Sequence, residues 1–161
     1  MENKTCDDIL IKDFYKIIKL SMDDTLPRYE RELQILQIAY PDKTEDELVD
    51  RPLEEVDEII DNILNKTENK IYQEINVADR TFTLKGDVDN FRFSFRQFKV
   101  FEQAVYDSNT EYLHTLLAHI YVDDTTPEER NAFFLENMTM RYANYFVLLL
   151  PDVIEKKIMR K

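Results

Sequence analysis

The chain has two histidines and one cysteine, which are the side chains that most often bind metals or act as nucleophiles. His114 and His119 are five residues apart on a predicted helix, so they point about 140° apart around its axis. They therefore cannot chelate one metal ion together. Cys6 lies far from both histidines in an acidic stretch, which raises the pKa of its thiol and weakens it as a nucleophile. These residues predict neither a metal site nor a nucleophile.

Carboxylates gather in two places where a metal could be considered. The predicted helix 53–66 carries five of them on one face: Glu54, Glu55, Asp57, Glu58 and Asp61. Without a second ligand-bearing segment, such a face is typical of a solvated helix. Asp87, Asp89 and Asn90 match part of a calcium loop, but the central glycine and the closing glutamate are missing at the required offsets. We expect a capped turn there, and no metal.

Enzyme signatures are also missing from the sequence. A single glycine, Gly86, rules out the glycine-rich loops that bind nucleotides, and it disfavours tight hairpin turns. No serine motif resembles a nucleophile elbow. The prediction is a protein without catalytic residues or cofactors, which is not an enzyme. A small enzyme whose site is scattered along the chain stays open as an alternative.

Two charged sets are candidates for binding a partner. Arg92, Arg96 and Lys99 recur at helical spacing and form a basic stripe beside the phenylalanines of a predicted helix. The opposite set comes from helix 53–66: Glu54, Glu58 and Asp61. The basic stripe has two interpretations: a solvent face or internal partner of the acidic helix, and a docking stripe for an acidic partner or nucleic acid. Nucleic acid is the weaker choice, because no broader positive patch accompanies the stripe.

The charge of the chain is strongly negative and uneven. The net charge is −12, of which residues 1–80 carry −10 and residues 81–161 carry −2. The acidic half repels nucleic acid and anionic lipid, so we expect neither as a direct partner. It either keeps the protein soluble or meets a basic partner. The longest apolar run, Tyr145 to Leu150, is too short to span a membrane, and the first residues lack the apolar core of a signal sequence.

The densest apolar pattern runs from Phe91 to Val122. Phe91, Phe95 and Phe98 have helical spacing, and Ser94 is placed to cap the helix. A second helix is predicted from Tyr112 to Tyr121, after a polar break. We expect this helical pair to form the centre of the core, with its phenylalanines buried.

The rest of the chain predicts a mainly α fold of the α+β class, with about seven or eight helices and one β-hairpin near residues 71–85. Other helices are expected over residues 11–20, 25–40, 44–49, 53–66, 126–136 and 139–150, with a last one from Asp152. Capping boxes begin the helices at Thr44 and Thr126. We divide the chain into an acidic helical region (1–66), a hairpin with linker (67–90) and a helical core region (91–161), which together make one compact domain.

The order of these segments resembles that of small tail-assembly-chaperone-like or virion-associated proteins of tailed bacteriophages, including the crAss-like phages. The best-matching segments are Phe95-Arg96-Gln97-Phe98 and residues 128–134. The chain differs from the family in its short acidic loop at residues 122–126 and its basic C-terminal segment. The resemblance implies a helical protein without catalytic residues.

The expected function is therefore a non-enzymatic phage assembly or virion-structural protein, acting in the tail or at the head–tail junction. Its expected partners are other phage structural or assembly proteins, including copies of itself within a particle. Its expected location is the host cytoplasm during assembly, with retention in the virion left open. The alternative is an acidic inhibitor or immunity-type protein that binds a basic nuclease or nucleic-acid-binding surface.

Overall fold

The computed structural model describes residues 2–108 and 111–147, and the side chains of residues 104–108 are not part of that description. The fold is mainly helical with one small antiparallel sheet, as the sequence predicts. The α-helices are α1 (Ile11–Ser21), α2 (Arg28–Ala39), α3 (Glu45–Val49), α4 (Leu53–Asn65), α5 (Phe95–Ser108), α6 (Leu113–Ile120) and α7 (Pro127–Asn137). The strands are β1 (Glu74–Val77), β2 (Arg80–Leu84) and β3 (Tyr121–Val122), and short 3-10 helices are η1 (Cys6–Asp8), η2 (Val88–Asn90) and η3 (Met140–Tyr142).

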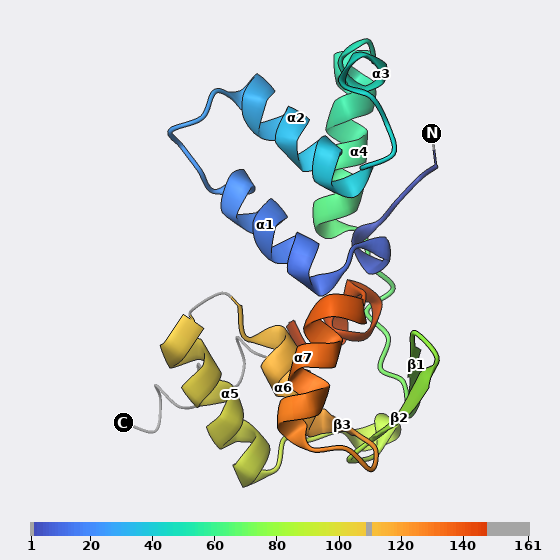
Figure 1. Cartoon of the computed structure of the whole chain (residues 1–161), viewed down its shortest axis with the longest axis vertical. Coiled ribbons are helices and arrows are strands. Elements are labelled where there is room, and N and C mark those ends of the chain that lie inside the picture. The colour runs from blue at the N-terminus through green and yellow to red at the C-terminus, as the bar shows by residue number, and fades with distance from the viewer. Residues whose placement is uncertain (1, 109–110, 148–161) are drawn as a thin grey trace.

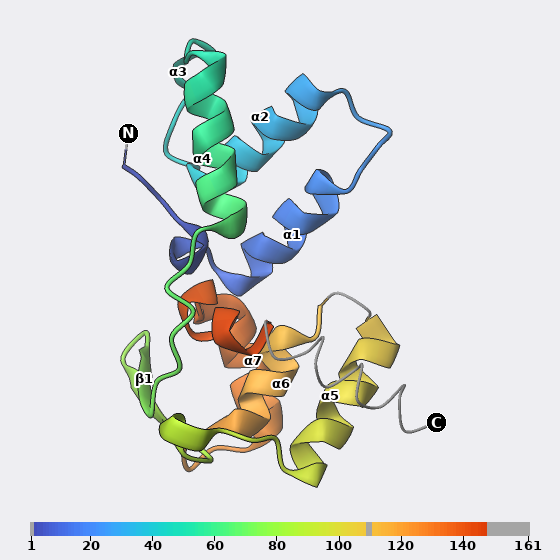
Figure 2. The ribbon, with the colours of Figure 1, turned by 180° about the vertical axis from the view of Figure 1, so that it is seen from behind.

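The elements form two lobes along the longest axis of the molecule. Helices α1 to α4 gather at one end, which we call the N-terminal lobe, and the sheet with α5, α6 and α7 forms the C-terminal lobe (Figures 1 and 2). Each lobe has its own cluster of buried apolar side chains. Helix α1 belongs to both, because Ile17 packs in the N-terminal cluster while Ile11 and Tyr15 pack in the C-terminal one.

Local sequence signals fix where several helices begin. Thr44 accepts a hydrogen bond from the Glu47 amide at 3.2 Å, and the Glu47 carboxylate accepts one from the Thr44 amide in return. Thr126 and Glu129 repeat this arrangement at the start of α7. Both predicted capping boxes are therefore confirmed. Such caps satisfy amides that have no partner within the helix.

The predicted hairpin is present but is not alone. Strand β3 pairs with β2 in antiparallel register, with Leu84 opposite Tyr121. The prediction that the second helix continues to Tyr121 was therefore wrong, since the backbone becomes extended there and its hydrogen-bonding groups serve the sheet. The loop between β1 and β2 is only two residues long, and Ala78 adopts a positive φ of 52° in it. A tight hairpin thus forms here without the glycine that such loops usually use.

The hairpin belongs to the C-terminal lobe and not to a separate region. Its inward side chains alternate along both strands and are almost completely buried: Ile75, Val77, Phe82 and Leu84. Phe82 lies edge-on to Phe134 of α7, with ring centroids 4.7 Å apart. The sheet and the segments from residue 91 onward therefore share one core.

The centre of the core differs from the prediction at its first helix. Ser94 caps α5 as expected, because its hydroxyl accepts from the Gln97 amide at 3.1 Å. The helix starts only at Phe95, however, so Phe91 lies outside it and packs edge-on to Phe146. The face that α5 buries runs through Gln97 and Phe101. Phe95 points away from that face and is 87% exposed, so the prediction that it is buried was wrong.

The segment before the end of the described chain is deeply buried, as predicted. Met140, Ala143 and Phe146 are completely inaccessible to solvent. The segment is less regular than expected, because η3 precedes the helical residues 144–147. Leu149, Leu150 and the helix predicted from Asp152 lie outside the described residues.

A buried carboxylate joins the two lobes. Asp7, which is only 3% exposed, accepts hydrogen bonds from the Thr67 hydroxyl at 2.7 Å, the Glu68 amide at 2.9 Å and the Asn144 side-chain amide at 2.8 Å. Burial alone would raise the pKa of Asp7, but these hydrogen bonds lower it. The carboxylate thus holds together the N-terminal segment, the linker after α4 and the end of the C-terminal lobe.

Candidate functional site

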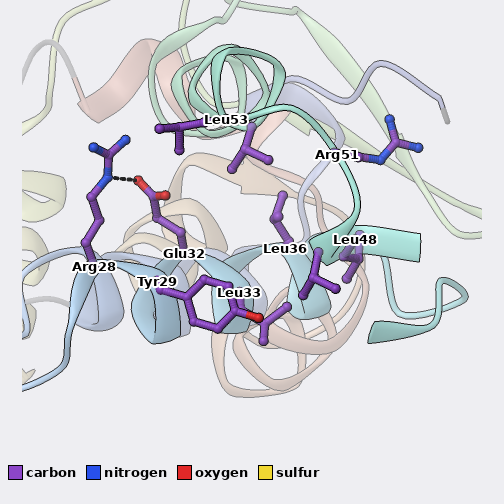
Figure 3. A pocket seen from close by; sticks show the side chains of 10 residues that line it. Arg28, Tyr29, Glu32, Leu33, Leu36, Leu48, Arg51 and Leu53 are labelled. Atoms are coloured by element: carbon purple, nitrogen blue, oxygen red, sulfur yellow. Dashed lines mark hydrogen bonds and ion pairs between the residues drawn. The ribbon is translucent and has the colours of Figure 1, made fainter. Parts of the chain in front are cut away.

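The N-terminal lobe carries a groove of about 470 Å³. It lies between α2, α3 and α4 (Figure 3). Its volume is within the range of small ligand pockets, and most of its lining is aliphatic. The lining residues are Arg28, Tyr29, Glu32, Leu33, Leu36, Leu48, Val49, Arg51, Leu53 and Val56.

The local sequence explains how the groove forms. The capping box at Thr44 holds α3 as a short helix, whose Leu48 is buried beside Leu36 of α2. Pro52 then precedes α4 directly, so the chain turns and places Leu53 at the first position of that helix. Only residues 50–52 separate α3 from α4, so the two helices lie close together beside α2. Leu33, Leu36 and Leu48 lie between the three helices and form the apolar floor of the groove.

Two large apolar side chains in the groove remain in contact with solvent. Tyr29 of α2 is 61% exposed and Leu53 of α4 is 62% exposed. Tyr29 shares the helical spacing of Leu33 and Leu36, but the face that α2 buries is centred on Ile35, Leu36 and Ala39. Exposed apolar side chains grouped around a concave surface are typical of protein-binding sites.

Arginines mark the two ends of the groove. Arg28 donates to Glu32 at 3.0 Å at one end and also pairs with Asp57 of α4, and hydrogen bonding to Glu32 is the main reason that its pKa is raised (Figure 3). Arg51 at the other end pairs with Glu55. The Nε atom of Arg51 is buried, and it is the one buried side-chain nitrogen or oxygen in the described part of the chain without a hydrogen-bond partner.

The groove lies in the most acidic part of the chain. Residues 28–61, which span α2 to α4, contain twelve acidic and four basic side chains, a net charge of −8. Both arginines at the groove are already paired with carboxylates. The groove therefore combines an apolar floor with negatively charged surroundings.

The acidic residues predicted to bind a partner lie beside this groove. Glu54, Glu58 and Asp61 are exposed on α4, the helix that also provides Leu53 and Val56 to the lining. Asp61 accepts a hydrogen bond from the side chain of Asn65 at 2.7 Å, so it is partly occupied within the helix.

The basic residues predicted to bind a partner lie elsewhere. Arg96 and Lys99 are exposed in the first turns of α5, and Arg92 is exposed just before that helix, in the C-terminal lobe. The structure thus does not bring them together with the acidic residues of α4, and within residues 2–108 and 111–147 it gives no ion pair between the two sets. Phe95, which is the most exposed large apolar side chain, lies among them.

The groove itself was missed from the sequence, although a signal for it exists. The apolar stripe Tyr29–Leu33–Leu36 on α2 and the stripe that begins at Leu53 on α4 both extend further than the apolar cluster that they cover. Such surplus apolar spacing at adjacent ends of two helices indicates a surface left for a partner.

His114 and Cys6 have structural partners, which are Tyr15 and Asn144 respectively. The hydroxyl of Tyr15 lies 2.7 Å from Nδ1 of His114 and accepts from the His114 backbone amide at 3.2 Å. Burial lowers the pKa of His114, which favours the neutral imidazole. Burial raises the pKa of Cys6 to about 11. A thiol with such a pKa is a poor nucleophile at neutral pH.

The residues that the structure describes include neither a metal-binding cluster nor a membrane-spanning helix. In this part of the chain, no three His, Cys, Asp or Glu side chains are arranged to hold a metal ion. No described helix combines the length and the apolar character needed to cross a membrane.

Comparisons with protein-family models, curated proteins and solved structures found no match to this chain.

Proposed function

We propose that this chain is a non-enzymatic binding protein that docks an apolar, basic segment of a partner into the groove between α2, α3 and α4. The observation that carries the proposal is the combination of the two exposed anchors, Tyr29 and Leu53, with a net charge of −8 around them. Helix-in-groove binding uses this combination: apolar side chains supply the affinity and complementary charge guides the approach.

The groove suits a peptide segment better than a reactive small molecule. Its arginines are engaged with Glu32, Asp57 and Glu55, so they act as fixed charges at its ends. Catalysis would instead require convergent reactive groups with shifted pKa values.

The biological setting that we propose is phage assembly, in the tail or the head–tail region or in the virion itself. The resemblance of residues 95–98 and 128–134 to segments of small phage assembly proteins supports this setting. An acidic, groove-bearing helical protein fits such a role, because assembly depends on reversible contacts between proteins. The partners are then phage structural or assembly proteins with a basic amphipathic segment.

Affinity purification from infected cells tests this proposal. The tagged chain should recover a defined phage structural protein in stoichiometric amount, and Leu53→Asp should lose it. Phe95→Asp is the matched control, since Phe95 is also exposed but lies in the other lobe. Recovery that is equal for both variants would show that the groove is not the binding site, and recovery of host proteins alone would exclude the assembly role.

A second candidate is an acidic inhibitor of a basic nuclease or nucleic-acid-binding protein. The exposed carboxylates of α4, Glu54, Glu58 and Asp61, favour it. An inhibitor of this kind binds mainly through charge, so its affinity falls steeply with salt and with Glu54→Gln and Glu58→Gln. The groove mechanism instead predicts a larger effect of Leu53→Asp than of the two neutral substitutions.

A further inference from the structure

We infer that the groove accepts the basic C-terminal segment, residues 152–161, of a second copy of this chain. The inference rests on the proposed function, because it names an occupant for the same groove. It goes further in predicting that the protein assembles with itself. Three features of the segment support it: its charge, its apolar pattern and the path that it would have to follow.

Charge complementarity is the first argument. The segment reads DVIEKKIMRK and carries four basic and two acidic side chains, whereas the region around the groove has a net charge of −8. Few other stretches of this acidic chain have a net positive charge. The basic segment is therefore attracted to the acidic surroundings of the groove.

The order of apolar and basic residues is the second argument. At about 100° per residue, Ile154, Ile158 and Met159 fall on one side of a helix, and Lys156, Lys157 and Arg160 fall on the other. In a helix-in-groove complex, the apolar side chains would contact the groove lining around Leu33 and Leu53. The basic side chains would face the acidic residues that surround the groove.

The path of the chain favours a second copy over the same molecule. Asn144 binds Asp7 at the junction of the lobes, where the Cys6 amide also donates to the Lys66 carbonyl at the C-terminal end of α4. Leu53 lies at the other end of that helix, about 18 Å further along its axis. Docking Ile154 in the same molecule would require the seven residues after Val147, which span about 25 Å at most, to run the length of α4 with Leu148, Leu149 and Leu150 drawn along it. A second copy has no such constraint.

A contact between the C-terminal segment of one copy and the groove of the next is heterologous. Each molecule presents both halves, so the contact repeats and gives either a closed ring or an open filament. This is the geometry that a protein needs in order to occur in many copies within a particle.

A complementation experiment tests the inference on the full-length chain. Sedimentation velocity should show wild-type protein self-associating as its concentration rises. The groove variant Leu53→Asp and the segment variant Lys156→Glu/Lys157→Glu should each associate at least tenfold more weakly. Mixing the two variants restores one intact contact, since the first still has a normal segment and the second a normal groove. The mixture should therefore form a one-to-one dimer and no larger species.

Matched controls and clear contrary outcomes complete the design. Phe95→Asp and Lys70→Glu/Lys85→Glu make the same chemical changes at exposed positions outside both the groove and the C-terminal segment, and they should leave self-association unchanged. Circular dichroism checks that every variant is folded. A wild-type protein that stays monomeric at millimolar concentration would overturn the inference, and so would self-association that survives Leu53→Asp. A monomer that still binds a phage protein through Leu53 would overturn the inference while leaving the proposed function intact.

Discussion

Replacement of Asp7 by asparagine is the sharpest test of how the two lobes are held together. The carboxylate is 3% exposed and accepts three hydrogen bonds, at 2.7, 2.8 and 2.9 Å. Hydrogen bonds to a buried charged group contribute about 1.5–3 kcal/mol each. Asparagine keeps the shape but has one acceptor oxygen, and its NH₂ group would face a donor. We expect the free energy of unfolding to fall by about 2–4 kcal/mol.

The pH dependence of the free energy of unfolding is a second measurement that tests the same substitution. Burial acts to raise the pKa of Asp7, but its hydrogen bonds lower it overall. A carboxyl group with a lowered folded pKa stabilises the protein above its unfolded pKa of about 3.9, and this stabilisation is lost as the pH falls through the folded pKa. Asp7→Asn should therefore flatten the acid side of the stability profile. Asp123 contributes in the same range, since hydrogen bonds and Arg80 outweigh its burial and lower its pKa to about 2, so some slope will remain.

Urea unfolding followed by far-ultraviolet circular dichroism measures both effects. Asp24→Asn is the matched control, because it removes the same charge from an exposed side chain. The control should change the free energy of unfolding by less than about 0.5 kcal/mol. If Asp7→Asn at neutral pH costs no more than the control, Asp7 does not couple the lobes and the reasoning is refuted.

Three further predictions concern the C-terminal lobe and its contact with α1. Phe82→Ala should lower the free energy of unfolding by about 3–5 kcal/mol in urea, because it removes a completely buried ring; a cost near that of the exposed Thr83→Ala would contradict this. Ala78→Gly should raise stability by about 0.5–1 kcal/mol in thermal unfolding, because glycine adopts the φ of 52° without strain, whereas a loss would show that Ala78 is not strained. His114 should titrate by NMR below about 6.5, since burial lowers its pKa; the contribution of this residue to stability is then complete above that pH and declines as the pH falls toward the folded pKa, and His114→Gln should remove that decline. A midpoint at or above 6.5 would contradict the buried, neutral imidazole.

The helix starts could be read from the sequence because their causes are local. A threonine followed three residues later by a glutamate satisfies amides that no other part of the chain needs to reach, as Thr44 and Thr126 show. The same holds for Ser94 and α5. The alternation of residues 74–84 likewise predicted the hairpin, because strand periodicity is independent of tertiary partners.

Spacing alone does not predict burial where a helix carries apolar side chains on more faces than the neighbouring elements cover. Phe95 and Tyr29 both continue an apolar stripe, yet each is exposed, because the neighbouring helix contacts the adjacent face. Spacing shows which side chains share a face but not which face another element covers. The third strand was missed for a similar reason: Tyr121 and Val122 follow a helix, and only the presence of β2 beside them makes them extended.

The candidate site divides in the same way. The sequence identified the acidic face of α4 and the basic stripe Arg92, Arg96 and Lys99, because charges on a helix are visible from their spacing. It could not show that the two sets lie on different lobes or that a groove lies beside the acidic one, since both facts depend on how the helices pack.

The sequence by itself determined the elements: which segments are helical, where their caps lie, where the hairpin turns and where charge accumulates. These follow from interactions within a few residues, which any folded arrangement of the chain would keep. The tertiary structure alone decided that α1 serves two cores, that Asp7 fastens the lobes and that Tyr29 and Leu53 stay exposed above an apolar floor. Those features join residues up to 137 positions apart, and only the packed chain brings them into contact.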